Sequence, residues 1–208
     1  MTTLRARSIL LAPALGLALA LSACAAGPGD GSTLTPVDDM PVLDAVDVAG
    51  EGTVIQIGDA RPQFCLGPIA ESYPPQCSGP ELVGWDWDTV DGEESSGDVT
   101  WGTYAVTGKW DGTSLLVGSA IMLALYDPLP VPDPALDADN AGTTSEERLL
   151  EIQSGIADDA PVEVLSTWVE NGYLFVRVLF DDGALQDWAD DAYGPDVVQI
   201  RPALRVLE

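Results

Sequence analysis

The chain lacks the residue types on which much enzyme chemistry depends. No histidine occurs among its 208 residues, which excludes Ser-His-Asp triads, Cys-His pairs and imidazole metal ligands. Lys109 is the only lysine and lies at an expected strand end, where a solvated surface lysine is the simpler interpretation. The sequence also has no Gly-x-Gly-x-x-Gly or Gly-Lys-Ser/Thr motif for phosphate. We therefore expect a protein that is not an enzyme.

Carboxylates are abundant, with 34 aspartates and glutamates in the chain. A glycosidase needs two of them about 5–10 Å apart, acting as acid and as nucleophile or base. A chain this rich in acidic residues brings such pairs together by chance, so abundance alone says little. A carboxylate-based hydrolase stays open as an alternative, and it requires a concave cleft in which two acids have different pKa values.

One acidic segment has a spacing close to that of a calcium-binding loop. Asp86, Asp88 and Asp91 precede Gly92, but the segment has one residue too many before the glycine for an EF-hand. The segment 137–147 fails too, because Arg148 stands where the EF-hand has its bidentate glutamate. An irregular calcium site at 86–94 or 137–147 remains an alternative to solvated acidic loops, with Asp86, Asp88 and Asp91 as the candidate ligands.

Two tryptophans lie beside these acids. The expected strand from Leu82 to Asp88 alternates, which places Trp85 and Trp87 on one face. They could form an aromatic surface for a sugar or a peptide, whereas tryptophans on one strand face more often belong to the core.

The first residues follow the order of an export signal. Arg5 and Arg7 precede an apolar run from Ile9 to Leu21, which is shorter than the roughly 20 residues that a membrane-spanning helix needs. The run closes on Leu21-Ser22-Ala23-Cys24, which resembles the lipobox of bacterial lipoproteins. The resemblance implies cleavage before Cys24, a diacylglycerol thioether on its sulfur and stable attachment through the acyl chains.

Two cysteines remain after lipidation. An exported protein with one such pair is expected to form one disulfide, here between Cys65 and Cys77, across a proline-rich loop. With no histidine and no further cysteine, this pair lacks the partners for a metal site.

The mature body is strongly acidic. Cleavage of the predicted signal peptide removes Arg5 and Arg7, which leaves six basic residues against 34 acidic ones, a net charge of −28. Such a body repels phosphate backbones and anionic lipids, so we expect no nucleic-acid partner and attachment to the membrane through the lipid alone. The partners left open are an envelope protein, a glycan or a cation.

The composition divides the chain into five parts: a signal peptide at 1–23, the lipidated cysteine and a flexible tether at 24–50, a β-rich domain with the disulfide loop at 51–126, a Pro/Asp-rich extended connector at 127–143, and an α+β domain at 144–208. Short strand patterns at 53–57, 82–88, 99–106, 115–117 and 121–126, with an Asp111-Gly112 type I′ turn, predict a small barrel or sandwich, an OB-like barrel among the options.

The C-terminal domain has a clearer pattern. Thr144 begins a capping box for a helix with Leu149, Ile152 and Ile156 on one face. Asn171-Gly172 predicts a hairpin between strands at 162–169 and 173–180. A second helix capped by Asp182, with Leu185, Trp188, Ala189 and Ala192 buried, precedes strands at 197–200 and 204–206. The order α-β-β-α-β predicts helices on one face of a small antiparallel sheet, and an α+β fold class for the chain.

Two segments carry a resemblance to a group of proteins. The stretch from Cys65-Leu66-Gly67 through Ser72-Tyr73-Pro74-Pro75-Gln76-Cys77 to Gly84-Trp85-Asp86-Trp87, and the ending Tyr193-Gly194-Pro195-Asp196-Val197-Val198, are similar to uncharacterised exported proteins and lipoproteins of high-GC Gram-positive bacteria. The resemblance supports an extracytoplasmic location and the disulfide, and it implies no activity.

The sequence therefore predicts a lipid-anchored protein on the extracytoplasmic face of the cell membrane, acting as a binding or interaction module of the envelope. A calcium-dependent or glycan-binding module and a carboxylate-based hydrolase are the alternatives. Ligand, partner and oligomeric state are not determined by the sequence.

Overall fold

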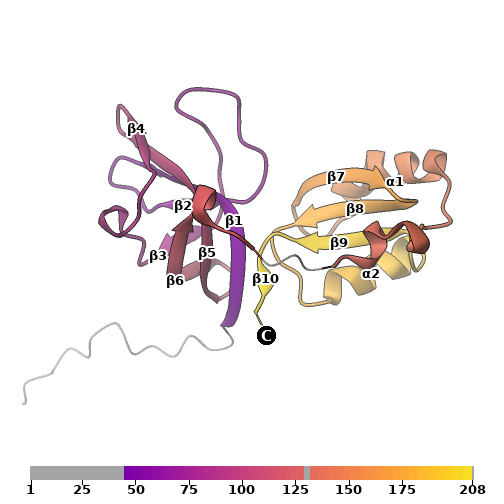
Figure 1. Ribbon diagram of the computed structural model, residues 1–208. Coiled ribbons are helices and arrows are strands. Elements are labelled where there is room, and N and C mark those ends of the chain that lie inside the picture. Colours follow the sequence, from indigo (N-terminus) through magenta and orange to yellow (C-terminus); the bar gives the residue numbers. More distant parts are fainter. Residues whose placement is uncertain (1–44, 129–131, 208) are drawn as a thin grey trace, which may run out of the picture. The chain divides into compact units, whose positions relative to one another are not determined.

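The computed structural model describes residues 45–128 and 132–207 (Figure 1). The described residues belong to one compact unit, which runs from Pro41 to Glu208. The predicted signal peptide, Cys24 and nearly all of the predicted tether lie outside the described residues. Within the described ranges, no helix combines the length and the apolar character needed to cross a membrane.

The first half of the described chain is a β-sheet that closes on itself. Its strands are β1 (Val46–Ile57), β2 (Gln63–Cys65), β3 (Glu81–Val83), β4 (Glu94–Ser96), β5 (Val99–Trp110) and β6 (Ser114–Met122). The order β1-β2-β3-β6-β5 returns to β1, because β1 also pairs with β5 along its whole length. The β3–β6 pair is parallel, and the other pairs of this ring are antiparallel. We call this closed sheet the barrel.

Inward-facing apolar side chains fill the barrel. Val54, Phe64, Tyr104 and Leu115 are fully buried, and Leu82 is nearly so. They come from all five strands of the ring, so the core forms only when the barrel closes. Strands can close this tightly where β1 has Gly52, because a Cβ there would meet the carbonyl oxygen of Cys65 on β2.

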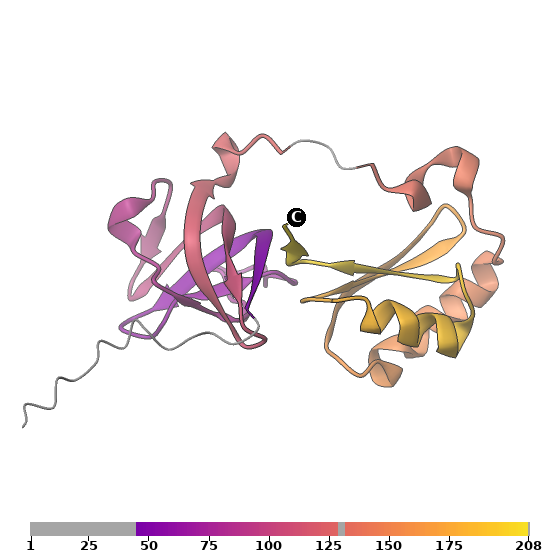
Figure 2. The same ribbon diagram turned by 90° about the horizontal axis from the view of Figure 1, so that it is seen from below.

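The second sheet is formed by β7 (Val164–Glu170), β8 (Tyr173–Val178) and β9 (Val198–Pro202). The helices α1 (Glu146–Asp159) and α2 (Ala184–Tyr193) cover one of its faces (Figures 1 and 2). The core between them contains residues of both helices and of the facing strand positions, namely Leu149, Ile152, Ile156, Leu174, Val176, Val178, Ala189, Val198 and Ile200.

The connector before α1 covers part of the other face of this sheet. It contains the short 3₁₀ helices η4 (Pro134–Leu136) and η5 (Ala138–Asn140), each capped by an aspartate, so the predicted extended connector is wrong here. Ala135 packs with Phe175, and Asn171 Nδ2 donates hydrogen bonds to the carbonyls of Ala135 and Asp137. These contacts bind the connector to the sheet.

The chain then returns to the barrel. After β9, Ala203 and Leu204 are buried in the barrel core, and β10 (Arg205–Val206) pairs antiparallel with β1. The backbone amides of Ala203 and Leu204 donate to the carbonyls of Val178 and Leu179, which extends the pairing of β8. The domain predicted at 144–208 includes these last residues, but their side chains pack in the core of the barrel, which was predicted as the separate domain 51–126.

Several predictions about this architecture are confirmed. The chain is a mixed α+β protein that is mostly β, with one larger and one smaller sheet. Leu149, Ile152 and Ile156 are the buried residues of α1, as predicted. Asn171 and Gly172 both have positive φ, 49° and 78°, as the predicted type I′ hairpin requires.

Other predictions are wrong in part. The smaller sheet is not wholly antiparallel, because β8 and β9 pair in parallel and α2 connects them. The first strand begins at Val46, inside the range predicted as tether. The hairpin between β5 and β6 exists, but Asp111 does not have the positive φ of a type I′ turn. Its carboxylate instead accepts hydrogen bonds from the amides of Thr113 and Ser114.

The helix starts also differ from the prediction. Ser145, not Thr144, caps α1, and its hydroxyl accepts the amide of Arg148 at 3.4 Å. The N-cap residue of α2 is Gly183, which has no side chain to cap the helix. The carboxylate of Asp181 instead accepts hydrogen bonds from the amides of Gly183 and Leu185. Of the four residues predicted to be buried on α2, Ala192 is exposed.

Candidate functional site

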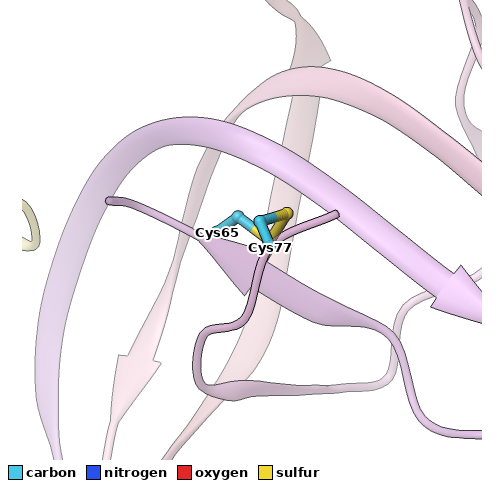
Figure 3. The surroundings of a disulfide bond; sticks show 2 residues. All are labelled: Cys65 and Cys77. Carbon is cyan, nitrogen blue, oxygen red and sulfur yellow. A yellow bond between two sulfur atoms is a disulfide. The ribbon is translucent and has the colours of Figure 1, made fainter. Parts of the chain in front are cut away.

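The predicted disulfide is present. Cys65 at the end of β2 bonds to Cys77, with their Cα atoms 5.9 Å apart (Figure 3). Cys65 is buried and packs with Ile55 and Trp101. The bond therefore fastens the loop 66–76 to the barrel wall, close to a buried cluster that belongs to β1 and β5.

Trp85 and Trp87 lie together, but they are half-buried rather than exposed. Both pack against the barrel core, and their ring centroids lie 5.2 Å apart in an edge-to-face arrangement. The Trp85 ring also lies edge-to-face with buried Tyr104, and Trp87 Nε1 donates to Gln56 Oε1 at 2.6 Å. These contacts favour the core interpretation over an open aromatic surface.

These tryptophans do not share a strand. The strand predicted from Leu82 to Asp88 ends at Val83, and Trp87 begins a short 3₁₀ helix, η2 (Trp87–Thr89). Asp86 caps this helix, because its carboxylate accepts the amide of Asp88 at 3.0 Å. The alternation of tryptophan and aspartate thus reflects a turn packed on the barrel.

The candidate cation ligands Asp86, Asp88 and Asp91 are all exposed. Asp86 is already engaged in capping η2. In the part of the chain that the structure describes, no group of three or more His, Cys, Asp or Glu residues comes together in a way that could hold a metal ion. A calcium site in this loop stays a prediction without a converging set of ligands.

The pKa of one tyrosine in the barrel core, Tyr104, is raised. Burial of Tyr104, with Glu93 and Asp91 as further contributors, raises its pKa to about 12. Its hydroxyl is buried, and no hydrogen-bond partner for it occurs among the described residues. Tyr104 therefore stays neutral at physiological pH and is suited to packing.

Other predicted sites have structural roles. Lys109 forms a salt bridge with Asp47 on the neighbouring strand, at 3.0 Å, which agrees with a surface lysine. The pKa of the Asp111 carboxyl is lowered, first by the hydrogen bond from the Ser114 amide. This shift comes from a turn and not from a second carboxylate in a cleft.

The strongest candidate for a binding site was not visible in the sequence. It is a cavity of about 480 Å³ beside the β5–β6 turn, which we call the apolar cavity. Trp110 and Leu66 contribute from the barrel, Leu165 contributes from β7, and Leu179 and Phe180 contribute from the segment that follows β8. The rings of Trp110 and Phe180 lie 6.4 Å apart, so two aromatic groups adjoin the space.

The chemistry of the apolar cavity is simple. Glu163 is the only charged residue that lines it, and Ser78 is the only residue with a hydroxyl. Val162 lies at its edge with 41% of its surface exposed. A volume in this range and a mainly apolar wall with few polar groups are typical of small-molecule and ligand sites.

The sequence held only an indirect signal for this cavity. Trp110 stands directly before the Asp111-Gly112 turn, and Leu179-Phe180 continue an apolar run past the end of β8. Their proximity depends on the return of the chain to the barrel, which no local pattern predicts.

No protein-family model matches the chain, and no curated protein or solved structure is similar to it by sequence or fold.

Proposed function

We propose that this chain is a lipoprotein, anchored through Cys24 on the extracytoplasmic face of the membrane, whose body is a non-enzymatic binding module. The observation that carries the binding role is the apolar cavity between Trp110 and Phe180. The anchor rests on the sequence of residues 1–24.

We further assign the barrel to the OB-like class. The ring β1-β2-β3-β6-β5, with its one parallel pair β3–β6, supports this assignment, because such barrels are small five-stranded Greek-key barrels. OB barrels bind ligands on the face of their second and third strands and with the loops beside it. The apolar cavity adjoins the ends of these strands, since Leu66 follows β2, Pro80 precedes β3 and Gly112 belongs to the β5–β6 turn, and this position supports the proposal.

The charge of the body limits the kinds of ligand that it can bind. Oligonucleotides are common ligands of OB barrels, but a mature net charge of −28 repels them. The apolar cavity offers Glu163 as its charged group and no basic side chain. The ligand it fits best is an apolar segment without negative charge, such as leucine and phenylalanine side chains presented by another envelope protein.

Binding at the cavity is tested with an acetylated and amidated peptide, Gly-Leu-Phe-Leu-Gly, against a Gly-Ser-Ala-Ser-Gly peptide of equal length. The protein is the body of residues 25–208, which contains the whole compact unit and its disulfide. Calorimetry should detect binding of the apolar peptide only. Val162→Glu should weaken this binding at least tenfold, because it places a second carboxylate at the edge of the cavity.

The matched control is Val83→Glu. Val83 is 36% exposed, similar to Val162, and does not line the cavity. It should leave the affinity unchanged. Equal weakening by both variants, or equal binding of the two peptides, would contradict the cavity as the binding site.

The anchor is tested separately by metabolic labelling with radioactive palmitate in the producing cells. The wild-type protein should incorporate label and stay in the membrane fraction, and Cys24→Ala should lose the label. Label that persists in the Cys24→Ala variant would refute lipidation at this cysteine, whatever the outcome of the binding experiment.

A further inference from the structure

One arginine of this acidic protein stands apart from the others. Among the described residues, five of the six basic side chains form salt bridges with carboxylates, and Arg177 forms none. Its Nε is buried and has no hydrogen-bond acceptor. A buried donor of a charged group without an acceptor is costly, and in a chain with 34 acidic residues a partner would be easy to supply.

Strand pairing determines what surrounds Arg177. On β8 it follows Phe175 by two residues, so both point away from the helices, toward the face that the connector partly covers. Arg201 on β9 is its direct neighbour in register, and Ser166 on β7 is the neighbour on the other side. A few residues after Arg201, β10 pairs with β1 and brings Arg205 beside this group.

Arg201 and Arg205 are already neutralised. Asp133 forms a bidentate pair with Arg201, with distances of 2.7 and 2.8 Å, and Glu51 pairs with Arg205 at 3.1 Å. Arg177, Arg201, Arg205 and Glu51 line a cavity of about 220 Å³, and Asp133 neutralises Arg201 from outside this lining. The lining contains three arginines, and the one carboxylate in it, that of Glu51, is paired with Arg205. When the charges of these arginines and of their paired carboxylates are added, one positive charge remains, that of Arg177.

A second, larger cavity also opens at Arg177. It measures about 450 Å³ and shares Glu51 and Arg177 with the first. Its other walls include the side chains of Leu66, Ile69 and Leu123. Ile69 is 41% exposed, so part of this apolar wall faces solvent. Arg177 thus stands between a small space rich in arginine and a larger space with an apolar wall.

We propose that Arg177 is an anion-binding residue that holds the carboxylate of a small ligand, with the apolar body of that ligand against Leu66, Ile69 and Leu123. A guanidinium binds a carboxylate through two parallel N–H donors. One uncompensated positive charge matches one carboxylate, and a phosphate would bring a second negative charge next to Glu51. This site shares Leu66 and Gly67 with the apolar cavity but is centred on Arg177, which does not line that cavity, and the inference does not rest on peptide binding there.

The probe is N-acetyl-leucine, which combines one carboxylate with an apolar side chain. Its amide has the same shape without the charge. Titrations of the 25–208 body by NMR, with ¹⁵N-labelled arginine, should show the Nε–H resonance of Arg177 shifting with N-acetyl-leucine and not with the amide. Arg177→Gln should weaken binding at least tenfold, and Arg177→Lys should weaken it less, because the charge remains.

The matched control variant is Arg148→Gln, which removes an exposed salt-bridging arginine on α1. It should bind N-acetyl-leucine like the wild type. Circular dichroism and the melting temperature establish that each variant is folded, and the comparison of acid with amide on the wild-type protein stands without any variant.

Four results would overturn the proposal. The first two are the absence of any binding and equal binding of acid and amide. The other two are an Arg177 Nε–H resonance that does not move at saturating probe, and inorganic phosphate binding at Arg177 more tightly than N-acetyl-leucine. The last would replace the carboxylate by a phosphate group as the ligand chemistry.

Discussion

Leu204 offers the sharpest test of the architecture, because it follows β9 of the second sheet and is fully buried in the core of the barrel. Leu204→Ala replaces a buried isobutyl group with a methyl group and leaves space that the closed barrel cannot easily fill. Leucine-to-alanine changes in such positions cost about 3 kcal/mol of unfolding free energy. For a domain of this size that corresponds to a fall in melting temperature of about 6–12 °C.

The assay follows urea unfolding with two signals. Far-ultraviolet circular dichroism reports α1 and α2, which belong to the second sheet, and near-ultraviolet circular dichroism reports aromatic packing, which includes the cluster around Tyr104 in the barrel. Both transitions should move together to lower urea in Leu204→Ala, since the two cores share the strand segment that follows β9.

Leu207→Ala is the matched control. Leu207 lies three residues later and is 46% exposed, so its loss should cost less than about 0.5 kcal/mol. The reasoning would be refuted if Leu204→Ala cost no more than Leu207→Ala, or if the helix signal unfolded unchanged while the barrel signal shifted.

Four further predictions concern stability. Replacing Cys65 and Cys77 with serine opens the loop that they close and should lower the unfolding free energy by about 3 kcal/mol, and chemical reduction of the wild type should do the same in urea unfolding. Tyr104→Phe removes a buried hydroxyl without a partner among the described residues, so stability at neutral pH should stay within about 1 kcal/mol of the wild type or rise, and a loss above about 2 kcal/mol would indicate an unseen partner. The pKa of Tyr104 is raised to about 12 from its ordinary value of 10.0, which stabilises the folded protein below pH 10, and this contribution is lost as the pH rises from 10 to about 12. Melting curves and tyrosinate absorbance should show the loss in the wild type and a smaller one in Tyr104→Phe. Asn171→Gly keeps the positive φ but removes two hydrogen bonds of 2.8 and 2.9 Å to the connector, and should cost about 1–2 kcal/mol in thermal unfolding, with an unchanged midpoint speaking against these bonds.

Local features of the fold were predictable because their causes are local. Asn171-Gly172 specifies its hairpin through backbone conformations that these two residue types tolerate. The spacing of Leu149, Ile152 and Ile156 marks the buried stripe of α1 because a helix repeats every 3.6 residues or so. Once Cys24 is assigned to the predicted lipid anchor, the two remaining cysteines allow one pairing, and that pairing is present.

Features that depend on distant segments were not predictable in the same way. The parallel pairing of β8 with β9 follows from the path of α2, and the strand patterns themselves read alike in either direction. Trp85 and Trp87 have the spacing of one strand face, but tertiary packing against Tyr104 and the capping of η2 by Asp86 place them in a turn.

The candidate sites were even less predictable from the sequence, because they depend on which distant segments meet. Sequence spacing drew attention to Asp86, Asp88 and Asp91, which are exposed and do not form a converging group among the described residues. Phe180 and Trp110 are far apart in the chain and meet because β10 returns to β1. The unpaired state of Arg177 becomes visible only when every other described basic residue is seen to have a partner.

The central claim is that the apolar cavity is the binding site of this module, and methyl NMR tests it most directly. The 25–208 body with ¹³C-labelled leucine and valine methyl groups is titrated with the acetylated and amidated Gly-Leu-Phe-Leu-Gly peptide. We predict that the methyl signals of Leu165, Leu179 and Val162 shift most. The signals of buried leucines and valines on the helix-covered face, such as Leu174, should stay in place. Saturable binding with the largest shifts anywhere other than the cavity lining, or no shift at all, would contradict the account.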